Sequence, residues 1–211
     1  THEGLGLSAA EYTAFMTAIR DVTRQPNVDG VYEVLGVADE QAYFDLFRTN
    51  PAGDVDDQKR GVITFFLLDP AHGGLGMPPA EFTAFFGMIR EFSRSEAILE
   101  FLGVDQGGYF DLWRSDQPGP EDEEIRGFLS ALAEGITEHF EDWEPFFHAD
   151  GRVRDEGLLR ALLTAFRNLE AIEPFLGDLS PADRAGVRMA IARDLVRYPD
   201  TWVGFFNEDG S

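Results

Sequence analysis

One predicted helix carries the residues whose types best suit metal binding or proton transfer. Glu134, Glu138 and Asp142 follow one another at four-residue steps, which places their carboxylates along one helical face. His139 lies on the same helix and could add an imidazole nitrogen. A zinc site needs several converging ligands, which a single helix cannot supply, and no HExxH or ExxH pair occurs in the chain. We therefore predict a solvated helix face here, with no metal ion and no cofactor.

A second candidate is a turn whose sequence pattern partly matches that of a calcium-binding loop. The stretch FFHADGRVRDEGLL has an acid-glycine turn followed by a helical pattern. An EF-hand loop needs oxygen ligands at its first, third and fifth positions and a bidentate acid at the twelfth. With Gly151 at the glycine position, the first, third and twelfth places hold Phe146, His148 and Gly157, and only Asp150 fits. We predict loose cation association with the acidic surface rather than a specific calcium site.

The chain also lacks the motifs of nucleophilic catalysis and of phosphate binding. It has no cysteine, no G-x-S-x-G elbow and no serine with a histidine at suggestive spacing. The glycine-rich stretch HGGLGMPP contains no lysine and follows no predicted strand, so it is not a phosphate-binding loop. Carboxylate pairs are too frequent for any one of them to be assigned to acid-base chemistry. We name no catalytic residue, and an enzyme that uses carboxylates and a metal is the least favoured of three hypotheses.

Acidic residues dominate the composition, with 39 Asp and Glu against 17 Lys and Arg and a net charge of -22. Such a field repels nucleic-acid phosphates and anionic lipids, and no apolar run is long enough for a membrane span. We therefore predict no nucleic-acid partner and no membrane span. Three origins of the acidity stay open: a salty habitat, ordinary acidic helix faces, or contact with a basic partner, including imitation of DNA.

Two long stretches of the sequence repeat in the same order. GLGLSAAEYTAFMTAIR begins at Gly4 and GLGMPPAEFTAFFGMIR begins at Gly74, a separation of 70 residues. Farther on, VLGV and YFDLFR match FLGV and YFDLWR, and the separation falls to 66 residues at Tyr43 and Tyr109. Ordered matches with so small a drift indicate an internal duplication with a few deleted loop residues.

A third, shorter copy follows. LLTAFRNL repeats the Thr-Ala-Phe of the first two copies, and FLGD stands where FLGV stood, but the YFDL block is missing. The second and third copies end alike, in DWEPFFHADG and TWVGFFNEDG. We predict two full units and one shortened unit, near residues 4–73, 74–149 and 150–208, within a single domain of residues 1–211. The final Asp-Gly-Ser either begins another unit of a longer array or is an acidic tail.

Each copy has the patterns of amphipathic helices rather than of strands. Ser8 opens a capping box ahead of an apolar stripe at three- and four-residue steps. Ser95 and Gly103 bound a short helix, and the stripe Ile125–Phe140 predicts one long helix. GVITFFLLD is rich in strand-forming residues but aligns with a helical segment of the second copy. Because no unit can bury its stripe alone, we predict an all-α fold of tandem helical repeats packed as one array.

The favoured function is a non-catalytic acidic scaffold or protein-interaction module, because repetition is combined with an absence of catalytic motifs. The alternative is a carrier of an apolar or aromatic small molecule in a Phe-rich cavity between units. The side chains predicted to line that cavity are Phe47, Phe86, Trp113, Phe147 and Phe206. The first residues have neither the basic start nor the apolar core of a signal peptide. We therefore expect a cytoplasmic protein, or an extracellular one if the sequence belongs to a longer array.

Overall fold

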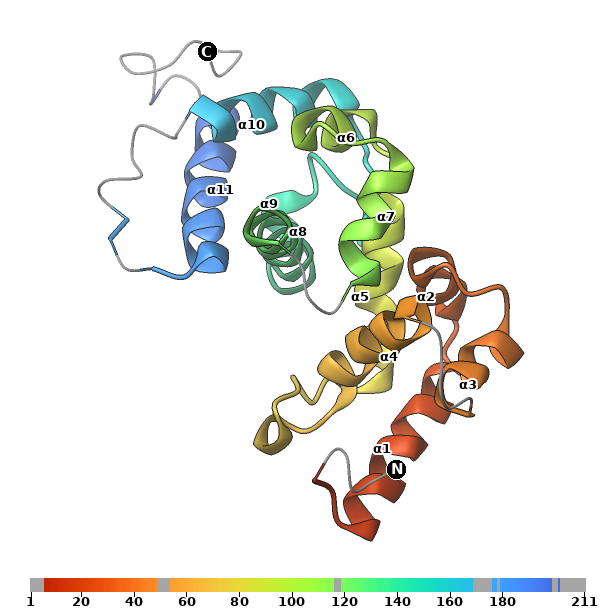
Figure 1. Cartoon of the computed structure of the whole chain (residues 1–211). Coiled ribbons are helices and arrows are strands. Elements are labelled where there is room, and N and C mark those ends of the chain that lie inside the picture. Colours follow the sequence, from red (N-terminus) through yellow and green to blue (C-terminus); the bar gives the residue numbers. More distant parts are fainter. Residues whose placement is uncertain are drawn as a thin grey trace. The chain divides into compact units, whose positions relative to one another are not determined.

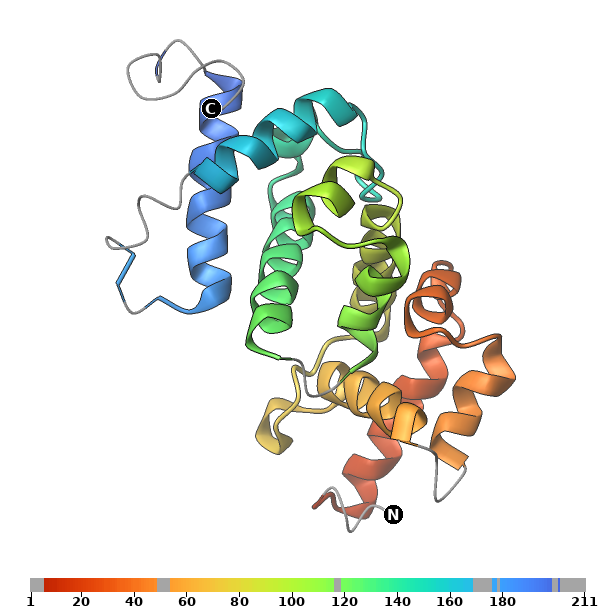
Figure 2. The same ribbon diagram turned by 45° about the horizontal axis from the view of Figure 1, so that its top comes forward.

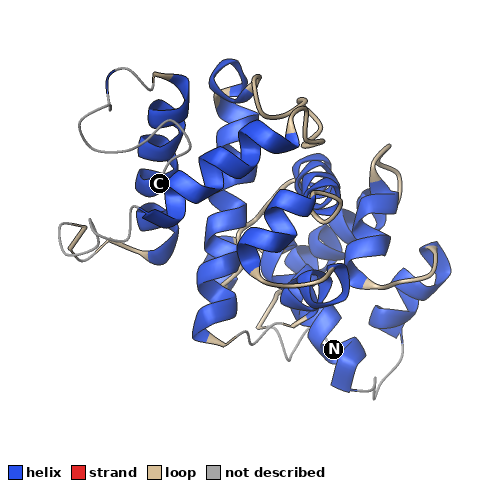
Figure 3. Ribbon diagram, turned by 90° about the horizontal axis from the view of Figure 1, so that it is seen from above, coloured by secondary structure: helices blue, strands red, loops and turns tan. Residues whose placement is uncertain are grey.

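The computed structural model describes residues 6–48, 54–115, 119–168, 176–177, 179–198 and 201. Within these residues every regular element is helical (Figure 3), and one isolated bridge joins Phe147 and Val153. The predicted all-α class is therefore confirmed. None of these helices is both long enough and apolar enough to cross a membrane. In chain order the elements are α1 (Ala9–Val22), α2 (Val28–Leu35), α3 (Glu40–Arg48), α4 (Asp54–Leu67), the 3-10 turn η2 (Pro70–His72), α5 (Pro79–Phe92), α6 (Glu96–Leu102), α7 (Gln106–Arg114), α8 (Pro120–Glu138), α9 (Phe140–Trp143), α10 (Glu156–Asn168) and α11 (Pro181–Arg197).

Helix boundaries follow the capping residues predicted from the sequence. The Ser8 side chain accepts a hydrogen bond from the amide of Glu11, and the Glu11 carboxylate accepts one from the Ser8 amide at 2.7 Å. Hydrogen bonding to the Glu11 carboxylate by the Ser8 side chain, and then by the Ser8 amide, favours the ionised form and lowers the pKa of Glu11. Ser95 caps α6 through the amide of Ile98, and Gly103 ends that helix in the left-handed region at a φ of 69°.

The structure differs from simple sequence expectations at two of the longer helices, α4 and α8. The strand-prone stretch after Gly61 is helical in α4, where Val62, Ile63 and Phe66 are buried. Burial on one helical face therefore outweighs the weak strand preference of these residues. The single helix predicted across Ile125–Phe140 is wrong at its end, because α8 stops before His139 and α9 begins after it. His139 has a φ of -133° and a ψ of 47°, outside the helical region, which turns the chain between the two helices.

The described residues divide into two compact units, the first comprising Thr1–Arg90 with Phe110–Gln117. In this unit α4 packs against α1 and α3, all in the red-to-yellow part of the chain (Figure 1). Aromatic rings form the core where α4, α5 and α7 meet. The centroid of Phe86 lies 5.4 Å from that of Phe66 and 6.2 Å from that of Trp113.

The second compact unit comprises Glu91–Tyr109 with Pro118–Ser211. Here α8 and α11 pack side by side, and α10 bridges α11 and α6 (Figure 2). The Glu156 carboxylate at the start of α10 accepts hydrogen bonds of 3.0 Å from the Ser95 hydroxyl and the Ala97 amide, where the dipole of α6 favours negative charge. Because both compact units include parts of α5 and α7, their boundaries differ from those of the predicted repeats. The single-domain description of the chain stays a prediction.

Candidate functional site

A groove on the first unit joins α1 and α3. Its volume is about 460 Å³, and the side chains that line it are Met16, Arg20, Thr23, Arg24, Glu40, Phe44, Phe47 and Arg48. We call it the α1–α3 groove. It combines apolar side chains with three arginines, in a chain whose net charge is -22. An apolar surface with cations beside it suits an amphipathic partner that carries partial or full negative charge.

Acidic neighbours orient the arginines of the groove. Arg20 and Arg24 both donate to one carboxylate oxygen of Asp21, at 3.2 and 3.3 Å. Arg48 lies 3.8 Å from Asp45, one helical turn earlier on α3. Both arrangements leave part of each guanidinium open to solvent, so the arginines keep donors to offer to a partner.

Two contacts hold α1 and α3 in register beneath the groove. The Thr23 hydroxyl at the end of α1 donates a 3.0 Å hydrogen bond to the carboxylate of Glu40 at the start of α3. The Phe47 ring meets Phe15 edge-on at a centroid separation of 6.5 Å, and it lies 6.0 Å from the ring of Tyr43. One hydrogen bond and one aromatic contact therefore join the two helices that form the groove.

Two tyrosines beside the groove stay neutral at physiological pH. Tyr43 is fully buried, with its ring centroid 5.9 Å from that of Tyr32. Burial raises the pKa of Tyr43 far above its usual value, and burial followed by nearby acids raises that of Tyr32. The Tyr43 hydroxyl has no hydrogen-bond partner among the described residues. Both rings therefore contribute to packing beside the groove.

The aligned face of α5 and α7 is covered by α2. Sequence alignment pairs α1 with α5 and α3 with α7. At the crossing of α2 and α5, a Cβ added to Gly30 would lie 2.9 Å from the Cα of Gly87. One turn farther along, a carboxylate oxygen of Glu33 lies 4.0 Å from Nε of Arg90. The two helices thus approach to backbone contact, which only a residue without a side chain at position 30 permits.

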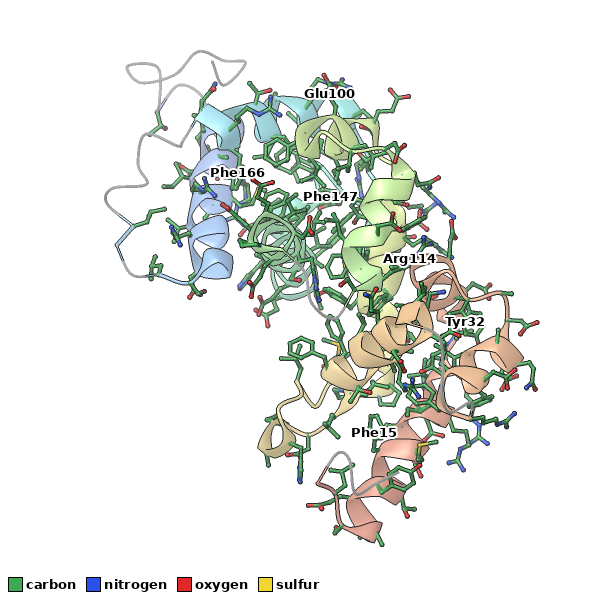
Figure 4. All side chains as sticks on the ribbon, in the orientation of Figure 1. Phe15, Tyr32, Glu100, Arg114, Phe147 and Phe166 are labelled. Atoms are coloured by element: carbon green, nitrogen blue, oxygen red, sulfur yellow. The ribbon has the colours of Figure 1, made fainter. Side chains whose placement is uncertain are left out.

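Arg114 of α7 caps the C-terminus of α2, and Figure 4 labels its side chain there. Its Nε donates to the carbonyl of Val34 at 2.9 Å, and a terminal nitrogen donates to the carbonyl of Glu33 at 3.3 Å. The last carbonyls of a helix are short of donors and carry the negative end of its dipole, so an arginine satisfies both. α2 ends at Gly36 in the left-handed region, at a φ of 62°.

The arginine side chains of the α1–α3 groove are more exposed than the aligned arginines of α5 and α7. The side chain of Arg48 is 61% exposed and that of the aligned Arg114 is 29% exposed. Arg20 is 50% exposed and the aligned Arg90 is 25% exposed. Arg48 and Arg114 otherwise make the same contacts within their own helices, with a guanidinium 5.4 Å from a phenylalanine ring in each case. Contacts with α2 contribute to the lower exposure of Arg90 and Arg114.

The predicted ligand-lining residues are distributed over different surroundings. Phe47 lines the α1–α3 groove. Phe86 and Trp113 are brought together in the core of the first unit, at 0% and 1% exposure. Phe147 is buried in the second unit, 5.7 Å from a ring of α5. Phe206 lies outside the described residues, as do Phe175 and Asp178 of the FLGD block and most of the TWVGFFNEDG stretch.

Sequence reasoning missed a small cavity in the second unit. Its volume is about 250 Å³, and it is lined by Phe101, Leu102, Glu124, Ile125, Phe128, Phe166, Arg167 and Arg188. We call it the Phe pocket. The Phe128 ring lies 5.3 Å from that of Phe101 and 4.8 Å from that of Phe166, which Figure 4 labels. Arg188 stacks over Phe166 at 4.8 Å and donates to Glu124 at 3.3 Å. Phe128 and Phe166 lie on apolar stripes that predict ordinary core, and no sequence motif marks the cavity between them.

Of the acids predicted near His139, Asp142 pairs with two arginines. Asp142 accepts a 2.6 Å hydrogen bond from Arg197 and lies 3.5 Å from Arg193. His139 lines a groove of about 660 Å³ between α8 and α11, together with Glu134 and Glu138. Across the part of the chain that the structure describes, no group of three or more His, Asp or Glu side chains could hold a metal ion.

Protein groups close the acid-glycine turn that resembles a calcium loop. The Arg152 amide and its Nε donate to Asp150 at 3.2 and 2.8 Å. Gly151 takes the left-handed conformation at a φ of 84°. The single carboxylate at a ligand position is thus already engaged by an arginine.

Comparison with protein-family models, with curated proteins and with solved structures finds no match for this chain.

Proposed function

We propose that this chain is a non-catalytic protein-interaction module built from tandem helical repeats, two full units and one shortened unit. Its binding surface is the α1–α3 groove. The observation that carries the proposal is the contrast between this groove, where Arg48 is 61% exposed, and the aligned face, where Arg114 is 29% exposed beneath α2. A surface with the composition of a helix-binding face, on which no helix of the described residues lies, is suited to receive one from a partner.

The lengths of the helices in the first two predicted repeats, residues 4–73 and 74–149, support the repeat part of the proposal. α1 to α4 have 14, 8, 9 and 14 residues, and α5 to α8 have 14, 7, 9 and 19. The threonines of the three Thr-Ala-Phe motifs, Thr13, Thr83 and Thr164, each donate to the carbonyl four residues earlier, at 2.8, 3.1 and 2.9 Å. Equal roles at aligned positions are what duplicated modules would produce.

A site-specific photo-cross-link tests the interaction surface. A photoreactive amino acid in place of Arg24, at the groove, is expected to capture one protein species in cells of the source organism. The same substitution at Arg152, in the second unit, is the matched control, because the two side chains are 63% and 62% exposed. The species captured at position 24 should then bind the purified chain, and Phe47→Ala should weaken that binding.

Two outcomes would contradict the proposed function. Capture of the same species at both positions would show unspecific contact with an acidic surface. Absence of any captured protein at position 24 would show that the groove is not an interaction surface.

The Phe pocket favours a second candidate function, a carrier of an aromatic anion. Three phenylalanine rings offer stacking surface, and Arg167 and Arg188 offer cations beside it. Naphthalene-2-carboxylate should therefore bind more tightly than the neutral naphthalene-2-methanol in a calorimetric titration. Arg188→Met should remove this preference, and equal affinities for the two compounds would contradict the carrier function.

A further inference from the structure

The partner of the α1–α3 groove can be described from the helix that covers the aligned face. Resting on the proposed function, we infer that the groove binds a two-turn helix of another module of the same kind, with its C-terminus at Arg48. That helix has the chemistry of α2. It carries a glycine at the crossing and an acid one turn later, and it ends at a glycine in the left-handed conformation, which leaves its last carbonyls open to accept hydrogen bonds.

The two faces of α2 have separate roles. Gly30, Glu33 and the carbonyl of Val34 meet α5 and α7. Tyr32 faces the other way and packs on Tyr43 of its own module, at a centroid separation of 5.9 Å. Three features are thus needed for docking on the next module, and they lie on one side of the helix, since positions 30, 33 and 34 are neighbours at 3.6 residues per turn.

The groove and the aligned face of α5 and α7 carry the same kinds of side chain at five positions, of which Arg90 and Arg114 contact α2. Aligned positions carry an apolar side chain, two arginines and two aromatic rings in both places: Met16 with Phe86, Arg20 with Arg90, Phe44 with Phe110, Phe47 with Trp113, and Arg48 with Arg114. The link between the two helices recurs as well. Thr23 donates to Glu40 at 3.0 Å, and at the aligned positions Gln106 donates to Ser93 at 3.3 Å.

One aligned position differs in size between α1 and α5. Thr17 of α1 stands where α5 has Gly87, the point of closest approach to α2. A Cβ added to Gly87 would meet its nearest heavy atom, the Cβ of Asn27, at 3.8 Å, which is ordinary contact. The side that has no room is position 30 of the docking helix. A small residue in the partner at that position is therefore the stronger requirement.

Charge selects the orientation of the partner helix. By analogy with Arg90 and Arg114, Arg20 would meet an acid on the partner, and Arg48 would donate to its last carbonyls. The reversed orientation would bring the positive end of the helix dipole to Arg48, which is unfavourable. This accounts for a cluster of arginines on one surface of a strongly acidic chain.

A helical peptide with the sequence of residues 25–37 is the probe. A hydrocarbon staple between positions 28 and 32 keeps it helical, on the side away from Gly30 and Glu33. Fluorescence anisotropy of the labelled peptide against the intact chain should show saturable binding. Arg48→Ala should weaken it at least about tenfold, because a charge-assisted hydrogen bond contributes roughly 1.5 to 3 kcal/mol.

Two matched controls accompany this titration. Arg152→Ala removes an equally exposed arginine from the second unit and should leave the affinity unchanged. The same stapled peptide with Gly30→Leu should bind at least about fivefold more weakly, because the added side chain overpacks a crossing where backbone meets backbone.

Each result decides between the two proposals. Binding that is insensitive to Arg48→Ala would overturn the inference. If the stapled peptide fails to bind while a cross-linked partner still requires the groove, the helix assignment is wrong and the proposed function stands. If neither peptide nor partner binds, both are wrong.

Discussion

Replacing Phe86 by alanine is expected to lower the free energy of unfolding by about 3 to 5 kcal/mol, the cost of deleting a buried aromatic ring. Its ring is fully buried and lies 4.6 Å from that of Phe82, 5.4 Å from that of Phe66 and 6.2 Å from that of Trp113. Removing it leaves a cavity that these rings cannot collapse to fill. Urea denaturation followed by circular dichroism measures the change.

Phe65→Ala is the matched control, because Phe65 is the neighbouring aromatic of α4 but is 44% exposed. Its loss should cost about 0.5 kcal/mol or less. The comparison also tests the ligand-lining prediction for Phe86. A side chain that lines an open cavity would cost little when truncated, so a change below about 1 kcal/mol would contradict its place in the core.

Alanine at the two glycines of the α2–α5 crossing is expected to act in opposite directions. Gly30→Ala should destabilise the chain by about 2 kcal/mol, because the new Cβ would lie 2.9 Å from the Cα of Gly87, and backbone cannot yield as a side chain can. Gly87→Ala should stabilise it by up to about 1 kcal/mol, because its Cβ meets only Asn27 at 3.8 Å and alanine is the better helix former. Chemical denaturation of the two variants checks both signs.

Stabilisation by Gly30→Ala would contradict the close crossing, and with it the template for the groove. A loss with Gly87→Ala would show that α2 approaches from the other side. In that case Thr17 would obstruct a helix in the groove, and the inferred partner would have to bind in a different register.

Local signals predicted much of the secondary structure. Ser8, Ser95 and Gly103 mark helix ends because their side chains or backbone conformations satisfy terminal amides and carbonyls within a few residues. The helical state of the stretch after Gly61 came from alignment with the second copy rather than from its own preferences. The break at His139 was not predicted, because the apolar stripe continues through it.

The candidate site depends on contacts that no local pattern encodes. In the sequence, YFDLFR and YFDLWR read as equivalents, and nothing there distinguishes Arg48 from Arg114. Only the approach of α2 to α5, set by residues far apart in the chain, covers one and leaves the other open. The same holds for the Phe pocket, since stripes identify buried rings without saying which rings meet around a cavity.

The most direct test of the central claim, that the α1–α3 groove receives a helix like α2, is an NMR titration of the intact chain with the stapled peptide. We expect the amides of Met16, Thr17 and Arg20 in α1, and of Phe47 and Arg48 in α3, to shift in proportion to the bound fraction, with those of α11 unmoved. Shifts confined to other helices, or spread evenly over the acidic surface, would contradict it.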